Sequence, residues 1–116
     1  MGKIRLNVNL PSNAKQELRE RMLRDGYGLR EKSRWIGEAI QNFVQTDDFP
    51  QLTEMANTLS NINATESVNI SSELDKELEE ACIKVRTVYP LLEGVKSLVV
   101  RASIIRRLWR PSNKQM

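Results

Sequence analysis

The sequence predicts a mostly α-helical protein built on a two-stranded antiparallel ribbon, in which one strand–helix–helix unit is used twice. Residues 3–10 alternate strictly between polar and apolar side chains, which is the pattern of a half-buried strand. The alternation returns over residues 61–70, and apolar residues at helical spacing follow each of the two stretches. Segments of the first half match segments of the second half at a nearly constant spacing. Such a constant spacing is typical of a supersecondary unit that is repeated.

The first unit is assigned to residues 1–46. One face of its strand carries the apolar side chains of Ile4, Leu6, Val8 and Leu10. The other face carries Lys3, Arg5, Asn7 and Asn9. Ser12 is the predicted N-cap of a first helix that Asp25 and Gly26 end, and Ser33 is the predicted N-cap of a second helix.

Residues 47–60 are predicted to form a helical connector, because Pro50 suits the first turn of a helix and an apolar stripe follows it. The second unit is assigned to residues 61–110. The polar face of its strand consists of Asn63, Thr65, Ser67 and Asn69. Glu66 interrupts the apolar face of this strand. One helix is predicted to follow with Ser72 as its N-cap, another from Lys96-Ser97 through Trp109, and residues 111–116 are predicted to be a frayed tail.

The repeat predicts how the two strands pair. A lone strand leaves its backbone hydrogen-bonding groups unsatisfied, whereas an antiparallel partner with the same pattern satisfies them. Residues 9–12 match residues 69–72, and Lys32-Ser33 matches Lys96-Ser97. We therefore expect one compact domain in which the two strands form a ribbon over the helices.

The amino-acid composition limits the classes of function that the chain can have. The chain has 116 residues with no His and a single Cys, so an internal disulfide is excluded and a zinc site has almost no ligands to draw on. The commonest acid–base group is missing, and we find no paired catalytic carboxylates and no phosphate-binding loop. We predict a protein that is not an enzyme and has no cofactor and no metal. Because the sequence has neither an apolar run long enough to span a bilayer nor a signal-peptide pattern, we expect it in the cytoplasm with no membrane partner.

Charge is distributed unevenly along the chain. Residues 1–46 carry a net +4, residues 47–93 a net −7 and residues 94–116 a net +6. Two basic ends around an acidic middle favour a polyanion-binding face made from both ends.

The pattern of strand and helices resembles the ribbon-helix-helix family, which includes the Arc and MetJ repressors. The resemblance rests in the first unit on residues 5–11, on the Asp25-Gly26 turn, and on Lys32-Ser33-Arg34 through Glu38-Ala39-Ile40. The second unit departs from the pattern at Glu66, at Pro90 and in a longer loop. Most family members supply one unit per chain and dimerise. Two units in one chain resemble a fused pseudo-dimer, as in TraY-type relaxosome accessory proteins of conjugative plasmids.

The resemblance implies sequence-specific binding of double-stranded DNA, with the ribbon lying in the major groove. The implied base-contacting residues are Lys3, Arg5, Asn7, Asn9, Thr65, Ser67 and Asn69. The implied phosphate-contacting residues, at the starts of the second helices, are Lys32, Ser33, Arg34, Lys96 and Ser97. Because Arg and Asn discriminate bases better than Thr and Ser, we expect the first strand to carry most of the specificity.

Other interpretations stay open at this point. The protein could be a transcriptional repressor, a plasmid replication or conjugation factor with a relaxosome or other protein partner, an antitoxin, or a protein-interaction module. Self-association on DNA is also open. Trp35 and Trp109 are expected in the core or a dimer interface, and Cys82 as a small buried hydrophobe. Arg106, Arg107 and Arg110 either contact DNA flanks or keep the last helix soluble.

Overall fold

Two antiparallel strands lie at the centre of one face of the protein. The computed structural model describes residues 2–59 and 61–109. Its elements follow the order β1 (Lys3–Pro11), α1 (Ser12–Arg24), a single 3₁₀ turn η1 (Leu29–Glu31), α2 (Lys32–Phe43), α3 (Phe49–Ala56), β2 (Ile62–Ser71), α4 (Ser72–Val88) and α5 (Val95–Trp109). β1 and β2 pair directly with each other, and Asn7 lies opposite Ser67. The predicted mostly helical fold with a two-stranded antiparallel sheet is confirmed.

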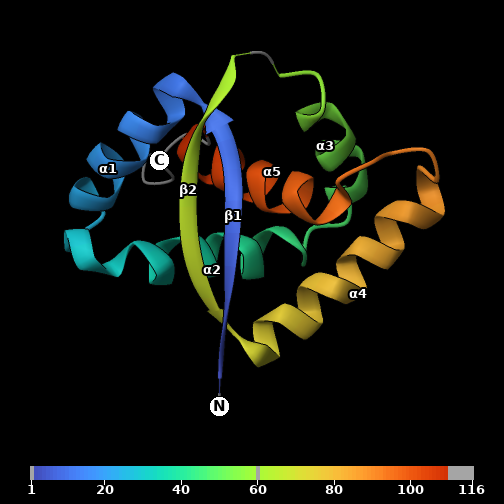
Figure 1. Ribbon diagram of the computed structural model, residues 1–116, viewed down its shortest axis with the longest axis horizontal. Helices are drawn as coiled ribbons and strands as arrows, with labels where there is room; N and C mark the ends of the chain where they lie inside the picture. The colour runs from blue at the N-terminus through green and yellow to red at the C-terminus, as the bar shows by residue number, and fades with distance from the viewer. Residues whose placement is uncertain (1, 60, 110–116) are drawn as a thin grey trace.

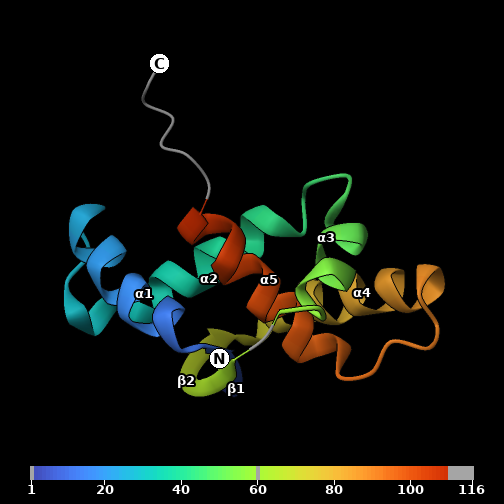
Figure 2. The same cartoon turned by 90° about the horizontal axis from the view of Figure 1, so that it is seen from above.

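The helices cover one face of the sheet and leave the other open. Figure 1 shows β1 and β2 crossing in front of the helices, with α1 and α4 on opposite sides of them. In the view of Figure 2 the strands lie along the lower edge of the molecule and the helices lie above them. The strand alternation explains this arrangement, since every second side chain points into the helical layer.

The core forms between the inner face of the sheet and the helices. Val8, Leu10, Val68 and Ile70 are buried on the sheet side. From the helices, the buried side chains include Leu18, Trp35, Ile40, Phe43, Leu78, Cys82, Val85, Val99 and Ile104. The predicted burial of Trp35 and Cys82 is confirmed. Burial also raises the pKa of the Cys82 thiol, which makes it a poor nucleophile.

The three serines predicted as N-caps do not cap their helices. Ser12 is the first residue of α1, whose N-cap is Pro11, and Ser33 is the second residue of α2, whose N-cap is Glu31. At α4 the capping hydroxyl belongs to Ser71 rather than Ser72, and it accepts a hydrogen bond from the backbone N–H of Leu74 at 3.0 Å. The hydroxyls of Ser12 and Ser33 are engaged elsewhere: both bond to groups of the second strand.

The other helix ends agree with the predictions within a residue or two. α1 ends at Arg24, and Gly26 follows with a positive φ of +88° that L side chains rarely adopt. Pro50 lies in the first turn of α3, as predicted. α5 begins at Val95, one residue before the predicted start, and is preceded by Gly94 with φ of +63°.

Among the described residues, no helix combines the length and the apolar character needed to cross a bilayer. The predicted frayed tail, residues 111–116, lies outside the described residues, as does Arg110.

Candidate nucleic-acid interface

The predicted base-contacting side chains all lie on the open face of the ribbon. The register pairs Lys3 with Ser71, Arg5 with Asn69, Asn7 with Ser67, and Asn9 with Thr65. Ser67 is half-buried and the other predicted residues are exposed. All of these residues have odd numbers, and the register pairs odd-numbered residues of β1 with odd-numbered residues of β2. Their side chains therefore point to the same face of the sheet and form one continuous polar strip.

Hydrogen bonds across the two strands orient this strip. The Ser67 hydroxyl donates to the side-chain oxygen of Asn7 at 2.7 Å and accepts from the Arg5 guanidinium at 3.3 Å. The Thr65 hydroxyl donates to the side-chain oxygen of Asn9 at 2.9 Å. A carbonyl oxygen has two lone pairs, so each Asn amide keeps one acceptor site and both N–H groups for a ligand. The second strand therefore positions the polar side chains of the first.

Three helical residues hold the backbone of the ribbon. Lys15 donates to the carbonyl of Thr65 at 3.0 Å, and Arg101 donates to the carbonyl of Asn9 at 2.8 Å. Ser33 accepts from the backbone N–H of Asn69 at 3.0 Å. Sequence reasoning missed Lys15 and Arg101, because each is far from its partner in the chain and neither belongs to a recognisable motif.

Glu66 lies on the inner face of β2 and is only 6% exposed. Its carboxylate is 2.7 Å from the ammonium of Lys32 and 3.9 Å from that of Lys15. A buried carboxylate needs such partners, because leaving it uncompensated would cost several kcal/mol. Lys32, a predicted phosphate contact, is therefore already engaged by an intramolecular ion pair.

The other two predicted phosphate-contacting cations are also paired within the chain. The Lys96 ammonium lies 2.8 Å from Asp75 and 2.7 Å from Glu79. Burial alone would lower the pKa of Lys96, but the bonds to these two carboxylates outweigh it and raise the pKa. Arg34 forms ion pairs with Glu31 and Glu38 while its side chain stays mostly exposed. The structure places Ser33 beside β2, and Ser97 is exposed in the first turn of α5.

Arg107 belongs to a cluster that joins α5 to α2. Its guanidinium lies 4.4 Å from the centre of the Trp35 ring and donates to the Trp35 carbonyl at 2.8 Å. The Trp35 ring N–H donates to Asp25 at 3.1 Å, and the Tyr27 hydroxyl donates to Glu38. The hydrogen bond from Tyr27 stabilises the ionised Glu38 and holds its pKa below the ordinary value. These contacts give Arg107 a structural role within the fold.

In the part of the chain that the structure describes, no group of three or more acidic or Cys side chains is arranged to hold a metal ion. What the open face offers is a row of hydrogen-bonding groups: a guanidinium, several amides and hydroxyls, and the ammonium of Lys3.

Comparison with protein-family models, with curated proteins and with solved structures finds no match to this chain. The functional interpretation therefore depends on the geometry and chemistry of its own residues.

Proposed function

We propose that the chain is a tandem ribbon-helix-helix protein, folded as an intrachain pseudo-dimer with residues 1–46 and 61–110 as its two units. The strand register supports this. Asn7 pairs with Ser67, its own counterpart in the second copy of the repeat, so the pairing is unchanged when the two strands are exchanged. The order of strand, helix and helix also occurs twice, with α3 between the units as the connector.

The proposed function is sequence-specific binding of double-stranded DNA by the open face of the ribbon. The observation that carries it is the unbroken polar strip over Lys3–Asn9 and Thr65–Asn69, held in place by cross-strand hydrogen bonds. The major groove, about 12 Å wide, accepts a two-stranded ribbon. The Arg5 guanidinium can donate hydrogen bonds to guanine O6 and N7, and the side-chain amides of Asn7 and Asn9 can form hydrogen bonds with adenine N6 and N7. A face that only meets water needs none of these residue types.

The site is proposed to be asymmetric. Arg5, Asn7 and Asn9 supply the base readout, while their counterparts on β2 act mainly by orienting them. Lys3 and Arg5 make no ion pair with any other described residue and are free to meet DNA. The proposed phosphate contacts of Lys32, Arg34 and Lys96 require exchange of their present carboxylate partners for phosphate. Ser33 and Ser97 would contribute through the starts of α2 and α5.

In a cell this activity would serve repression of transcription or an accessory role in plasmid maintenance or conjugation. Both roles need the same first step, recognition of a short duplex site.

Selection of bound duplexes from a random-sequence pool tests the proposal. The full chain should enrich a short motif, and its affinity for that motif should exceed its affinity for unselected duplex by at least about a thousandfold. Binding to the unselected duplex should weaken steeply with salt. A chain that enriches no motif, or that binds single strands in preference to duplex, would contradict the proposed function.

A further inference from the structure

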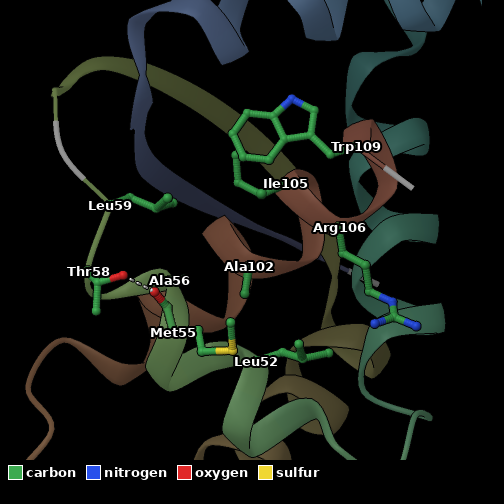
Figure 3. A pocket seen from close by; sticks show the side chains of 9 residues that line it. All are labelled: Leu52, Met55, Ala56, Thr58, Leu59, Ala102, Ile105, Arg106 and Trp109. Carbon is green, nitrogen blue, oxygen red and sulfur yellow. Dashed lines mark hydrogen bonds between the residues drawn. The ribbon is translucent and has the colours of Figure 1, made fainter. Parts of the chain in front are cut away.

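An apolar groove lies between α3 and α5 (Figure 3). Its volume is about 480 Å³, and it is lined by Leu52, Met55, Ala56, Thr58, Leu59, Ala102, Ile105, Arg106 and Trp109. Figure 3 shows Leu52 and Met55 of α3 facing Ile105 and Trp109 of α5 across it. Met55 is 59% exposed and Trp109 is 47% exposed. Large apolar side chains left open together mark a surface that a partner covers.

The internal repeat shows that this apolar surface is specific to α5. In the first copy of the repeat, Gln41 and Gln45 take the places of Ile105 and Trp109, and both glutamines are exposed. Helix packing within the repeated unit therefore does not require apolar side chains at these positions. α3 covers part of the surface, and the groove is the part that stays open.

A protruding apolar loop lies next to α3 as well. Leu91, in the loop between α4 and α5, is 93% exposed, the most of any exposed large hydrophobic side chain in the described chain. Together with Val88 and Glu54 of α3 it borders a second, smaller hollow. Glu93 follows shortly after Leu91 and is exposed. The molecule thus carries an apolar projection with an acidic neighbour and an apolar groove with a basic neighbour, Arg106.

We propose that the groove is the docking site for a second copy of this chain, with Leu91 of each copy inserted into the groove of the other. Since projection and groove both border α3, a two-fold axis near α3 satisfies both contacts at once and closes the assembly at a dimer. Glu93 of one copy then faces Arg106 of the other. Met, Trp and Arg, which line the groove, are enriched at protein interfaces. None of the groove-lining residues belongs to β1 or β2, and the proposed dimer does not depend on the proposed DNA binding.

The chain's own residues 110–116 are the competing occupant. Their sequence, Arg-Pro-Ser-Asn-Lys-Gln-Met, contains two cations and no acid. Filling the groove with it would bring like charge to Arg106, whereas the Leu91 loop brings an apolar side chain and a carboxylate. Charge complementarity therefore favours the second copy.

Sedimentation of the full chain at concentrations from about 10 μM to about 1 mM tests the proposal. The concentrations are high because an interface built on one inserted leucine and one ion pair from each copy is small and is expected to be weak. The wild type should shift from monomer to dimer over this range. Leu91→Ser should raise the dissociation constant at least about tenfold. Leu23→Ser, the matched control, removes another exposed leucine on α1 and should leave dimerisation unchanged.

Charge-reversal variants distinguish the two candidate occupants of the groove, a second copy of the chain and the chain's own residues 110–116. Arg106→Glu and Glu93→Arg should each weaken the dimer, and the double variant should recover it, because the pair is restored in opposite orientation. Circular dichroism of each variant checks that the fold is retained. A wild type that stays monomeric to about 1 mM, a dimer that Leu91→Ser leaves unchanged, or a double variant with no recovery would each overturn the proposal. Assembly beyond the dimer would overturn the two-fold arrangement.

Discussion

Glu66 occupies the place on the second strand that Leu6 occupies on the first. A carboxylate on an inward face would normally oppose folding. Here Lys32 and Lys15 approach it from α2 and α1 and supply the compensating charge. The same contact occupies two cations next to the ribbon. Glu66 therefore lowers the net positive charge beside the ribbon.

Glu66→Gln should make DNA binding more dependent on salt. Without the carboxylate, Lys32 and Lys15 can each neutralise a phosphate, and the plot of log binding constant against log salt should steepen by about one to two units. Titration of an unselected duplex by fluorescence anisotropy at several salt concentrations measures the slope. Glu80→Gln makes the same charge change on the exposed surface of α4 and is the matched control. Equal slopes in the two variants would remove these lysines from the interface.

At the scale of single residues, the sequence predicted correctly on which face of a strand a side chain lies, because the two-residue period of the strand alone decides this. Strict alternation placed Arg5 and Asn7 on the open face correctly. It could not show that Lys32 pairs with Glu66 or that Arg101 supports Asn9, since these contacts join elements far apart in the chain. The predicted capping role of Ser33 failed for the same reason: its hydroxyl bonds to β2.

At the scale of elements, α1 is defined by how it ends. The backbone N–H of Tyr27 donates to the carbonyl of Met22 at 2.8 Å, and this turn requires a positive φ at Gly26. The turn directs the chain to η1 and the start of α2, and so places Lys32 and Ser33 beside the ribbon. The Asp25-Gly26 sequence was enough to predict this end, because few residues other than Gly adopt that conformation.

Gly26→Ala should lower the free energy of unfolding by about 1–2 kcal/mol, through the strain of a side chain at positive φ. An added methyl group meets no atom within 4 Å at this position, so the effect is one of backbone conformation alone. Gly28→Ala is the control, since Gly28 has a φ of −76° and its added methyl group would make only an ordinary contact. Chemical denaturation of both variants measures the difference, and equal stabilities would show that α1 does not need this turn.

At the scale of the whole molecule, two surfaces have different chemistry. The strands present hydrogen-bonding groups on their open face, whereas α3 and α5 line an apolar groove to which neither strand contributes a residue. The internal repeat was sufficient to predict the pairing of the strands, because an antiparallel partner with the same pattern was already in the chain. The groove could not be predicted, since it depends on how far α3 covers α5.

In the proposed pseudo-dimer, the second helices of the two units carry different surfaces. α2 and α5 are counterparts in that proposal, yet exposed glutamines lie around the end of α2 and Trp109 lies at the end of α5. Fusion of two units in one chain would permit this divergence, because each copy of the unit can change independently. In a dimer of identical chains, by contrast, any substitution is present in both copies of the unit.

Measuring the affinity of the Arg5→Ala variant for the selected duplex tests whether the open face of the ribbon reads DNA bases. If the open face of the ribbon reads bases, the variant should lose about 1–3 kcal/mol of binding free energy on that duplex. Its preference should disappear at one base position and persist at the others. Arg24→Ala, which removes another exposed arginine, in the last turn of α1, should bind as the wild type does. An equal loss on every sequence would make Arg5 a phosphate contact, and no loss on any sequence would contradict the assignment of this face to DNA.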